Sequence, residues 1–233
     1  MYYGLIPLLI SMAFAMIASA RVQSTFQRFS QVRAMRGLTG AQAARLVLDA
    51  NGLNDVQIER IQGSMTDNYD PRSRTLHLSQ TVCDVPSVSA ISVACHEAGH
   101  AIQHAVGYTP LKIRNSIVPV ASIASSFSWI LVIGGIMLTA MGQGQYGIIG
   151  NTLFEIGIYA FLAVVLFHLV TLPVEFDASN RAISSMETLG ITAGDEIKSV
   201  KQVLSSAALT YIAALAVSVA NLLRVLSLRG NRR

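Results

Sequence analysis

The longest stretch without a charged residue runs from Asn115 to Phe154 and reads NSIVPVASIASSFSWILVIGGIMLTAMGQGQYGIIGNTLF. A helix needs about 20 apolar residues to cross the hydrocarbon core of a bilayer. These 40 residues are therefore enough for two crossings. The glycine-rich segment Gly142–Gly147 divides the stretch. Together these features predict a helical hairpin with spans near Ile117–Met141 and Ile148–Leu172.

Two further uncharged runs lie near the ends of the chain. The first, Tyr2–Ala20, is closed by Arg21, and the other, Gln202–Leu223, is closed by Arg224. The first run is too long for the apolar core of a signal peptide and no basic segment precedes it, so we expect an anchor that is retained. The sequence thus predicts four transmembrane helices.

The composition supports this interpretation. Of the 233 residues, 52% are hydrophobic and only 13% are charged. So few charges cannot cover the surface of a soluble domain, and a disordered chain would be less hydrophobic. The net charge of +4 comes from basic residues beside the spans, which points to a membrane rather than to nucleic acid. The two cysteines, Cys83 and Cys95, indicate buried reduced thiols rather than a disulfide framework.

The basic residues also indicate the orientation. With four spans, both termini lie on one side and the segments 21–115 and 173–201 lie on the other. Four arginines follow the first span, and cytoplasmic loops are enriched in such residues, so we expect these two segments in the cytoplasm: Arg21, Arg28, Arg33 and Arg36. The basic tail opposes this assignment, and a last helix that is interfacial or re-entrant is the alternative: Arg224, Arg229, Arg232 and Arg233.

The expected organisation has five parts. They are a first transmembrane helix, 1–20; a cytoplasmic region, 21–115; a transmembrane hairpin, 116–172; a second cytoplasmic segment, 173–201; and a fourth transmembrane helix with a basic tail, 202–233.

The first polar region has clear local signals. Thr39-Gly40-Ala41-Gln42 has the spacing of a capping box and predicts a helix that ends at Asn51-Gly52. Two runs with strand character, Val56–Ile61 and Thr75–Ser79, are separated by the turn-forming residues Asp67–Pro71 and suggest a short β-hairpin. A helix is predicted from Ser87 to Val106, with Gly107 as its stop.

The predicted Ser87–Val106 helix carries His96-Glu97-Ala98-Gly99-His100, the H-E-x-x-H pattern of metallohydrolases. Residues four apart lie one turn apart on one helix face, so both imidazoles can reach one zinc ion. Glu97 lies about 100° around the helix from His96, where it can take a proton from a water that the ion activates. The flanking residues are mostly apolar, and three ionisable groups among them need partners.

A catalytic zinc ion needs a third protein ligand and an open position. Glu175 follows the third span directly, and the hairpin returns it to the membrane face that carries the H-E-x-x-H helix. We therefore expect Glu175 to be the third ligand, with a solvated acidic turn as the alternative. Asp177 and Asn180 follow it and are candidates to orient a ligand histidine through its other ring nitrogen.

Four more side chains are candidates for supporting roles. His104 shares the face of His96 but lies about 12 Å along the helix axis, too far to bind the same ion. Tyr69, His77 and Arg181 are candidates to stabilise negative charge on a reacting carbonyl oxygen. His77 lies on the Thr75–Ser79 strand, which we expect to pair with an extended substrate.

Three blocks resemble the YugP family of bacterial membrane-bound neutral zinc metallopeptidases: Asp67–Pro71 with Thr75–Ser79, His96–His104, and Leu172–Ser179. The likeness extends over nearly the whole chain. More distantly, the chain is similar to the HtpX and CAAX-prenyl-protease metallopeptidases, in which a Glu after a membrane hairpin completes the zinc site. The resemblance implies His96, His100 and Glu175 as ligands and Glu97 as the catalytic base. Those distant relatives have an Asp four residues after the ligand Glu, where this chain has Ser179.

The sequence therefore predicts a mainly α membrane protein with four transmembrane helices. A small α+β zincin-like catalytic domain, made of a short β-hairpin and the H-E-x-x-H helix, is expected on the cytoplasmic face. The predicted function is hydrolysis of peptide bonds in a protein or peptide substrate at the cell membrane, with one zinc ion as cofactor and the lipid bilayer as the other partner.

Two other functions are compatible with parts of this pattern. An intramembrane protease would carry H-E-x-x-H inside an apolar span, whereas here the motif precedes Lys112 and Arg114. A non-catalytic membrane scaffold or adaptor, with a structural metal or none, is the alternative from another class.

Overall fold

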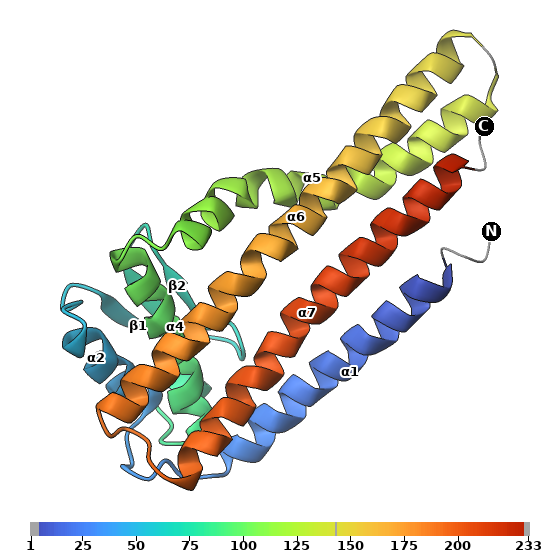
Figure 1. Ribbon diagram of the computed structural model, residues 1–233. Helices are drawn as coiled ribbons and strands as arrows, with labels where there is room; N and C mark the ends of the chain where they lie inside the picture. Colours follow the sequence, from blue (N-terminus) through green and yellow to red (C-terminus); the bar gives the residue numbers. More distant parts are fainter. Residues whose placement is uncertain (1–4, 143, 231–233) are drawn as a thin grey trace. The chain divides into compact units, whose positions relative to one another are not determined.

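The computed structural model describes residues 5–142 and 144–230. Within these residues the chain is mainly helical and has one small sheet (Figure 1). In chain order the elements are α1 (Leu5–Ser30), α2 (Gly40–Ala50), β1 (Gln57–Ile61), β2 (Asn68–Asp70), β3 (Thr75–Ser79), α3 (Gln80–Cys83), α4 (Val88–Ala105), α5 (Thr109–Ala140), α6 (Gln145–Thr188) and α7 (Asp195–Gly230).

Four of the described helices, α1, α5, α6 and α7, are long and apolar enough to cross a membrane, as the sequence predicts. Each extends beyond the predicted span because polar residues end a membrane crossing without ending a helix. The 44 residues of α6 are about 66 Å long at 1.5 Å per residue, roughly twice the thickness of a hydrocarbon core. Tyr2, Gln143, Arg232 and Arg233, which belong to the predicted first span, hairpin turn and tail, lie outside the described residues.

The chain divides into two compact units. The first, called here the helical unit, comprises residues up to Ile17, Ile113–Leu172, and the chain from Tyr211 onward. The second, called here the mixed unit, comprises Ala18–Lys112 and Pro173–Thr210 and includes the sheet. All the site residues predicted from the sequence belong to the mixed unit.

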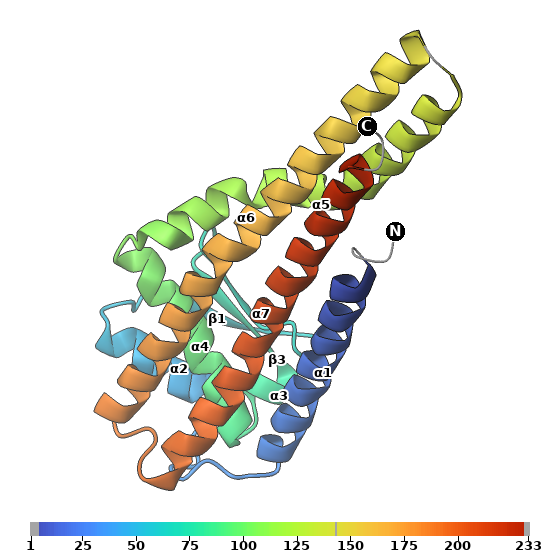
Figure 2. The ribbon, with the colours of Figure 1, turned by 45° about the vertical axis from the view of Figure 1, so that its right-hand side comes forward.

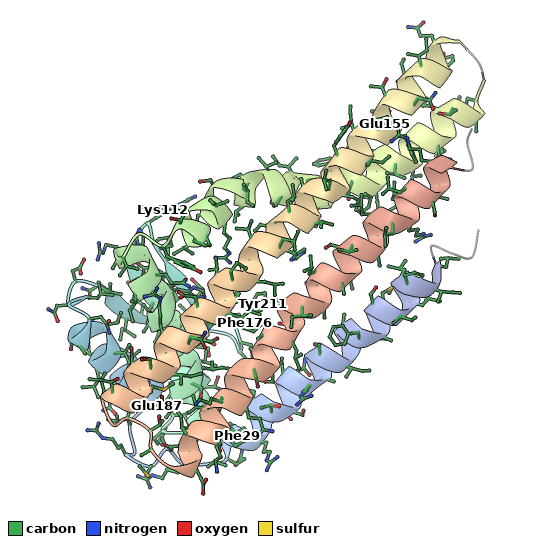
Figure 3. All side chains as sticks on the ribbon, viewed as in Figure 1. Phe29, Lys112, Glu155, Phe176, Glu187 and Tyr211 are labelled. Atoms are coloured by element: carbon green, nitrogen blue, oxygen red, sulfur yellow. The ribbon has the colours of Figure 1, made fainter. Side chains whose placement is uncertain are left out.

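In the helical unit, α5 and α6 pack through small residues. A Cβ atom added at Gly135 of α5 would lie 2.6 Å from the carbonyl oxygen of Gly150 on α6. Elsewhere on the same two helices, Trp129 and Phe161 meet edge to face, with ring centroids 5.2 Å apart. Glu155, labelled in Figure 3, forms an ion pair with Arg229 at 2.8 Å. Close approach at small residues is the usual way in which helices associate in a bilayer.

The predicted pairing of the two strand-like runs is wrong. β1 and β3, which are labelled in Figure 2, are parallel, with Gln57 opposite Thr75 and Ile61 opposite Ser79. The 13 residues between them are long enough for the crossover that parallel strands require. β2, which was expected to be part of a turn, pairs antiparallel with β3 and forms the short hairpin instead.

β3 is the central strand of the order β1-β3-β2, so both of its edges face other strands. The expectation that the Thr75–Ser79 strand pairs with a substrate is therefore wrong, since its backbone groups are already paired. The turn formers of the Asp67–Pro71 segment act at the end of β2, where Asp70 Oδ1 accepts a hydrogen bond from the amide of Arg72 at 2.8 Å.

The capping box at Thr39 is confirmed. Thr39 Oγ1 accepts from the Gln42 amide at 3.3 Å, and Gln42 Oε1 accepts from the Thr39 amide at 3.0 Å. The helix ends at Asn51, and Gly52 takes a left-handed conformation with φ of +73°. This cap sets α2 against α4 in the core of the mixed unit.

That core combines segments from six of the described helices and the sheet. Phe29 of α1, labelled in Figure 3, is buried in it. The largest fully buried side chains include Leu48 of α2, Leu76 and Leu78 of β3, Ile91 of α4 and Met186 of α6. Val200, Val203 and Leu204 of α7 complete it. The H-E-x-x-H helix therefore has a rigid apolar support on one face.

Candidate metal centre

Three side chains from two helices meet in the mixed unit. Glu175 Oε2 of α6 lies 3.3 Å from His96 Nε2 and 3.6 Å from His100 Nε2, both on α4. The three potential ligand atoms all lie within 4.8 Å of one another. The His96, His100 and Glu175 side chains are 14%, 12% and 4% exposed, respectively. The structure thus brings together the residues that the sequence predicts as metal ligands.

Residues next to the two ends of α4 determine where the helix begins and where it ends. Ser87 Oγ accepts a hydrogen bond from the amide of Ala90 at 3.2 Å and so caps the first turn. At the other end Gly107 has a φ of +68°, which terminates the helix where the sequence predicts. Cys95, next to the first ligand, faces the core, and burial raises the pKa of its thiol well above the usual range.

The close approach of α4 to α6 depends on Gly99, which lies between the two histidines. A Cβ atom at this position would overlap the backbone carbonyl of Ala178. Ala178 is one turn after Glu175 on α6, and Pro173 lies inside the same continuous helix. Gly99 therefore allows the imidazoles and the carboxylate to converge.

The second ring nitrogen of each histidine has its own partner. His96 Nδ1 lies 3.1 Å from the hydroxyl of Ser179, and His100 Nδ1 lies 3.0 Å from Oε1 of Gln103. Both Nε2 atoms are thereby directed towards Glu175. Ser179 stands where the resemblance to the distant relatives would place an Asp. Its hydroxyl contacts the imidazole of His96.

Glu97 is 9% exposed and belongs to the same cluster of charges. Burial raises the pKa of its carboxyl, and the two imidazoles only partly oppose that effect. Burial also acts to lower the pKa of His100, but the hydrogen bond with Glu175 and the charge of Glu97 outweigh it, so the net shift is upward. The carboxyl of Glu97 is therefore easier to protonate than an exposed glutamate, a property that suits a proton acceptor.

Tyr69 and His104 form a pair one turn beyond His100. The Tyr69 hydroxyl lies 2.9 Å from His104 Nδ1, so His104 contacts β2 rather than either ligand histidine. Burial raises the pKa of the Tyr69 hydroxyl, which remains protonated at neutral pH. Of the three candidates for stabilising a carbonyl oxygen, Tyr69 is the one bonded to α4.

The remaining candidates are held in other ways. His77 Nδ1 lies 3.6 Å from Glu59 Oε2 on β1. Arg181 donates from Nε to Asp177 Oδ2 at 2.6 Å. Asp177 reaches a ligand histidine only through Gln103, whose Nε2 donates to its carboxylate at 2.8 Å. Asn180 lines a separate hollow of about 350 Å³, to which none of the three ligand residues contributes.

Three residues at the site were not predicted in their observed roles: Gln103, Ser179 and Asp67. Gln103 and Ser179 contact the ligand histidines, and helical spacing from His100 and from Glu175 was the signal that would have found them. Asp67, interpreted as a turn former, accepts hydrogen bonds from the amide and hydroxyl of Ser79 at 2.7 and 3.2 Å. Its charge also raises the pKa of Glu97.

The donor set fits a single zinc ion. Two imidazoles and one carboxylate form a set that catalytic zinc sites use. Ligand distances of about 2.0–2.1 Å in a tetrahedral site separate the ligand atoms by about 3.3–3.4 Å. The two distances from Glu175 Oε2, 3.3 and 3.6 Å, are close to that separation.

The fold and the site together define a protein with four candidate membrane spans and a His-His-Glu cluster that fits a metal ion. A family model described as "Putative neutral zinc metallopeptidase" matches residues 4–230, and the chain belongs to this family. The chain is also 45% identical over 216 residues to "Putative membrane protease YugP" of Bacillus subtilis (strain 168), which covers 93% of this chain and 92% of that relative. No solved structure matches the chain significantly. The family resemblance predicted from the sequence is thus confirmed.

Proposed function

We propose that the protein is a zinc metallopeptidase that hydrolyses peptide bonds at the membrane face. The observation that carries the proposal is the convergence of His96, His100 and Glu175, with the buried carboxyl of Glu97 beside them. Family membership and the membrane protease relative support the same class of reaction. In this role the mixed unit is a zincin-like catalytic domain.

His96, His100 and Glu175 would hold the zinc ion. When bound, the ion would polarise the scissile carbonyl and make water acidic enough to be deprotonated near neutral pH. Glu97 accepts the proton from the attacking water and later donates it to the leaving amine. Burial raises the pKa of this carboxyl, which favours acceptance of the proton.

Two further features would contact the substrate. Tyr69, held by His104, offers its hydroxyl proton to the developing oxyanion. β2 is an edge strand of the sheet, so its outer side is available to an extended peptide. Tyr69, His104 and β2 all belong to the mixed unit.

The position of Glu175 supports cleavage close to the bilayer. The uncharged part of α6 runs from residue 156 to residue 174, and Glu175 is the first charged residue after it. Nineteen residues are about one bilayer crossing. The arginines after the first apolar run favour the cytoplasmic side for the mixed unit.

The test is cleavage of casein and of unfolded membrane proteins by the purified full chain, with products identified by mass spectrometry. A peptidase cleaves them, loses activity with a zinc chelator, and recovers it when zinc is returned. A scaffold with a structural metal would bind zinc but yield no products at any enzyme concentration, and that result would exclude the proposal.

A further inference from the structure

Gln103 is fully buried on α4, one turn after His100. Its amide makes three contacts. Nε2 donates to the carbonyl oxygen of Val174 at 2.7 Å and to Asp177 Oδ2 at 2.8 Å, and Oε1 lies 3.0 Å from His100 Nδ1. Val174 immediately precedes Glu175. One side chain therefore contacts the segments that carry the second and third metal ligands.

The orientation of this amide follows from its partners. A backbone carbonyl and a carboxylate only accept hydrogen bonds, so the nitrogen of Gln103 must face Val174 and Asp177. The oxygen then faces His100, and an oxygen acceptor requires the proton on Nδ1. The lone pair of the neutral ring is left on Nε2, the atom that lies 3.6 Å from Glu175.

Asp177 is itself held in place. Arg181 donates to the same carboxylate oxygen at 2.6 Å, and its guanidinium lies 5.7 Å from the ring centroid of Tyr108. This contact orients the Asp177 carboxylate as an acceptor. Gln103 is buried and Asp177 is partly buried, so loss of the Gln103 amide leaves His100 Nδ1 and Asp177 without these hydrogen bonds.

His96 has no equivalent constraint. Its Nδ1 contacts the hydroxyl of Ser179 at 3.1 Å, and a hydroxyl can either donate or accept. Ser179 therefore does not select one neutral form of the imidazole. The protein defines the protonated nitrogen at His100 and leaves it open at His96.

We propose that Gln103 is a positioning residue. It holds His100 with its proton on Nδ1 and fixes α4 against the turn of α6 that carries Glu175. This role rests on the proposed function, because it assumes that His100 and Glu175 bind zinc. Removing such an outer partner of a metal-binding histidine typically costs about 10–100-fold in metal affinity.

The experiment measures zinc affinity of the purified full chain by competition with a chromophoric chelator. Gln103→Leu removes all three contacts and is expected to weaken zinc binding about 10–100-fold. The control is Ser92→Ala, also buried on α4, whose hydroxyl donates within its own helix to the carbonyl of Val88 at 2.6 Å. It should bind zinc as the wild type does.

A second pair of variants tests the direction of the hydrogen bonds. Gln103→Glu keeps an acceptor for His100 but sets a carboxylate against Asp177, so zinc binding should weaken. Adding Asp177→Asn supplies a donor to that carboxylate and should restore part of the affinity. If Gln103→Glu weakened zinc binding only by disturbing the packing of α4, adding Asp177→Asn would not restore it.

The outcomes separate the two proposals. A wild type that binds no zinc overturns the proposed function. A wild type that binds one zinc, together with a folded Gln103→Leu variant of equal affinity, overturns only the role of Gln103. If Gln103→Leu does not fold, equal affinity of Gln103→Glu with and without Asp177→Asn has the same meaning.

Discussion

Helix α6 makes a close contact with a neighbouring helix in each unit, and the two contacts differ in chemistry. In the helical unit, a Cβ at Gly150 would lie 2.7 Å from the backbone nitrogen of Thr139 on α5. In the mixed unit, Gly99 admits the backbone of Ala178 in the same way. The first contact lies between apolar helices, whereas both histidines of the candidate metal site make hydrogen bonds near the second. The same kind of close packing thus occurs in a candidate membrane span in one half of the helix and at the candidate metal site in the other.

The largest effect is expected from the acidic residues of α6. Glu175→Ala should abolish zinc binding and reduce peptidase activity to background, because two imidazoles alone hold the ion weakly. The matched control is Glu155→Ala, which breaks an exposed ion pair with Arg229 worth at most about 1 kcal/mol. Zinc content and casein cleavage of both variants provide the comparison. Equal loss in the two variants would show that α6 acts only as a support.

Glu97→Gln should lower peptidase activity about 10²–10⁴-fold while zinc content stays unchanged. Burial raises the pKa of Glu97, so the ionised carboxylate destabilises the fold as pH rises from its unfolded to its folded pKa. Gln removes this cost, and the chelator-treated variant should unfold at a higher temperature than the wild type. Turnover, zinc content and thermal unfolding at pH 7 test the two statements. Full activity in the variant would exclude Glu97 as the base.

Removal of zinc should destabilise the mixed unit more than the helical unit. A ligand present at 100 times its dissociation constant stabilises the folded state by about 2.7 kcal/mol. Hydrogen exchange with and without chelator should therefore show faster exchange around α4 and the start of the Pro173–Thr188 segment. Protection of α5 near Gly135 is the internal control. Uniform change along the chain would contradict a local site.

The smallest expected difference concerns the two glycine contacts. Gly99→Ala and Gly135→Ala both place a Cβ against backbone, and such overpacking costs about 1–3 kcal/mol. Their effects on unfolding should be similar. Only Gly99→Ala should weaken zinc binding, because only it separates the imidazoles from Glu175. Isothermal titration of both variants with zinc tests this, and equal affinities would remove the distinction between the contacts.

Local patterns explain why much of this structure could be predicted from the sequence. The capping box at Thr39, the limits of α4 and the apolar runs depend on neighbouring residues only. The strand pairing depends on a crossover of 13 residues, for which no short-range signal exists. β2 was not predicted because Asn68 and Asp70 are typical turn residues. The same segment forms an edge strand here, in which Tyr69 contacts His104 of α4.

The candidate site likewise combines residues that local patterns predict with contacts that depend on residues distant in the chain. His96, Glu97 and His100 are defined by spacing along one helix, and Glu175 by its place after an apolar run. The hydrogen bond between Gln103 and Val174 joins residues 71 apart in the chain, so no local pattern indicates it. Its detection requires the packing of α4 on α6, which Gly99 permits and the sequence alone does not specify.

The core of the mixed unit includes Val200, Val203 and Leu204, so the final long helix takes part in it. A ribosome synthesises these residues after Glu175, the last of the three candidate metal ligands along the chain. Until then the H-E-x-x-H helix lacks part of its apolar support. The candidate metal centre consequently gains its complete apolar support only after most of the chain has been synthesised.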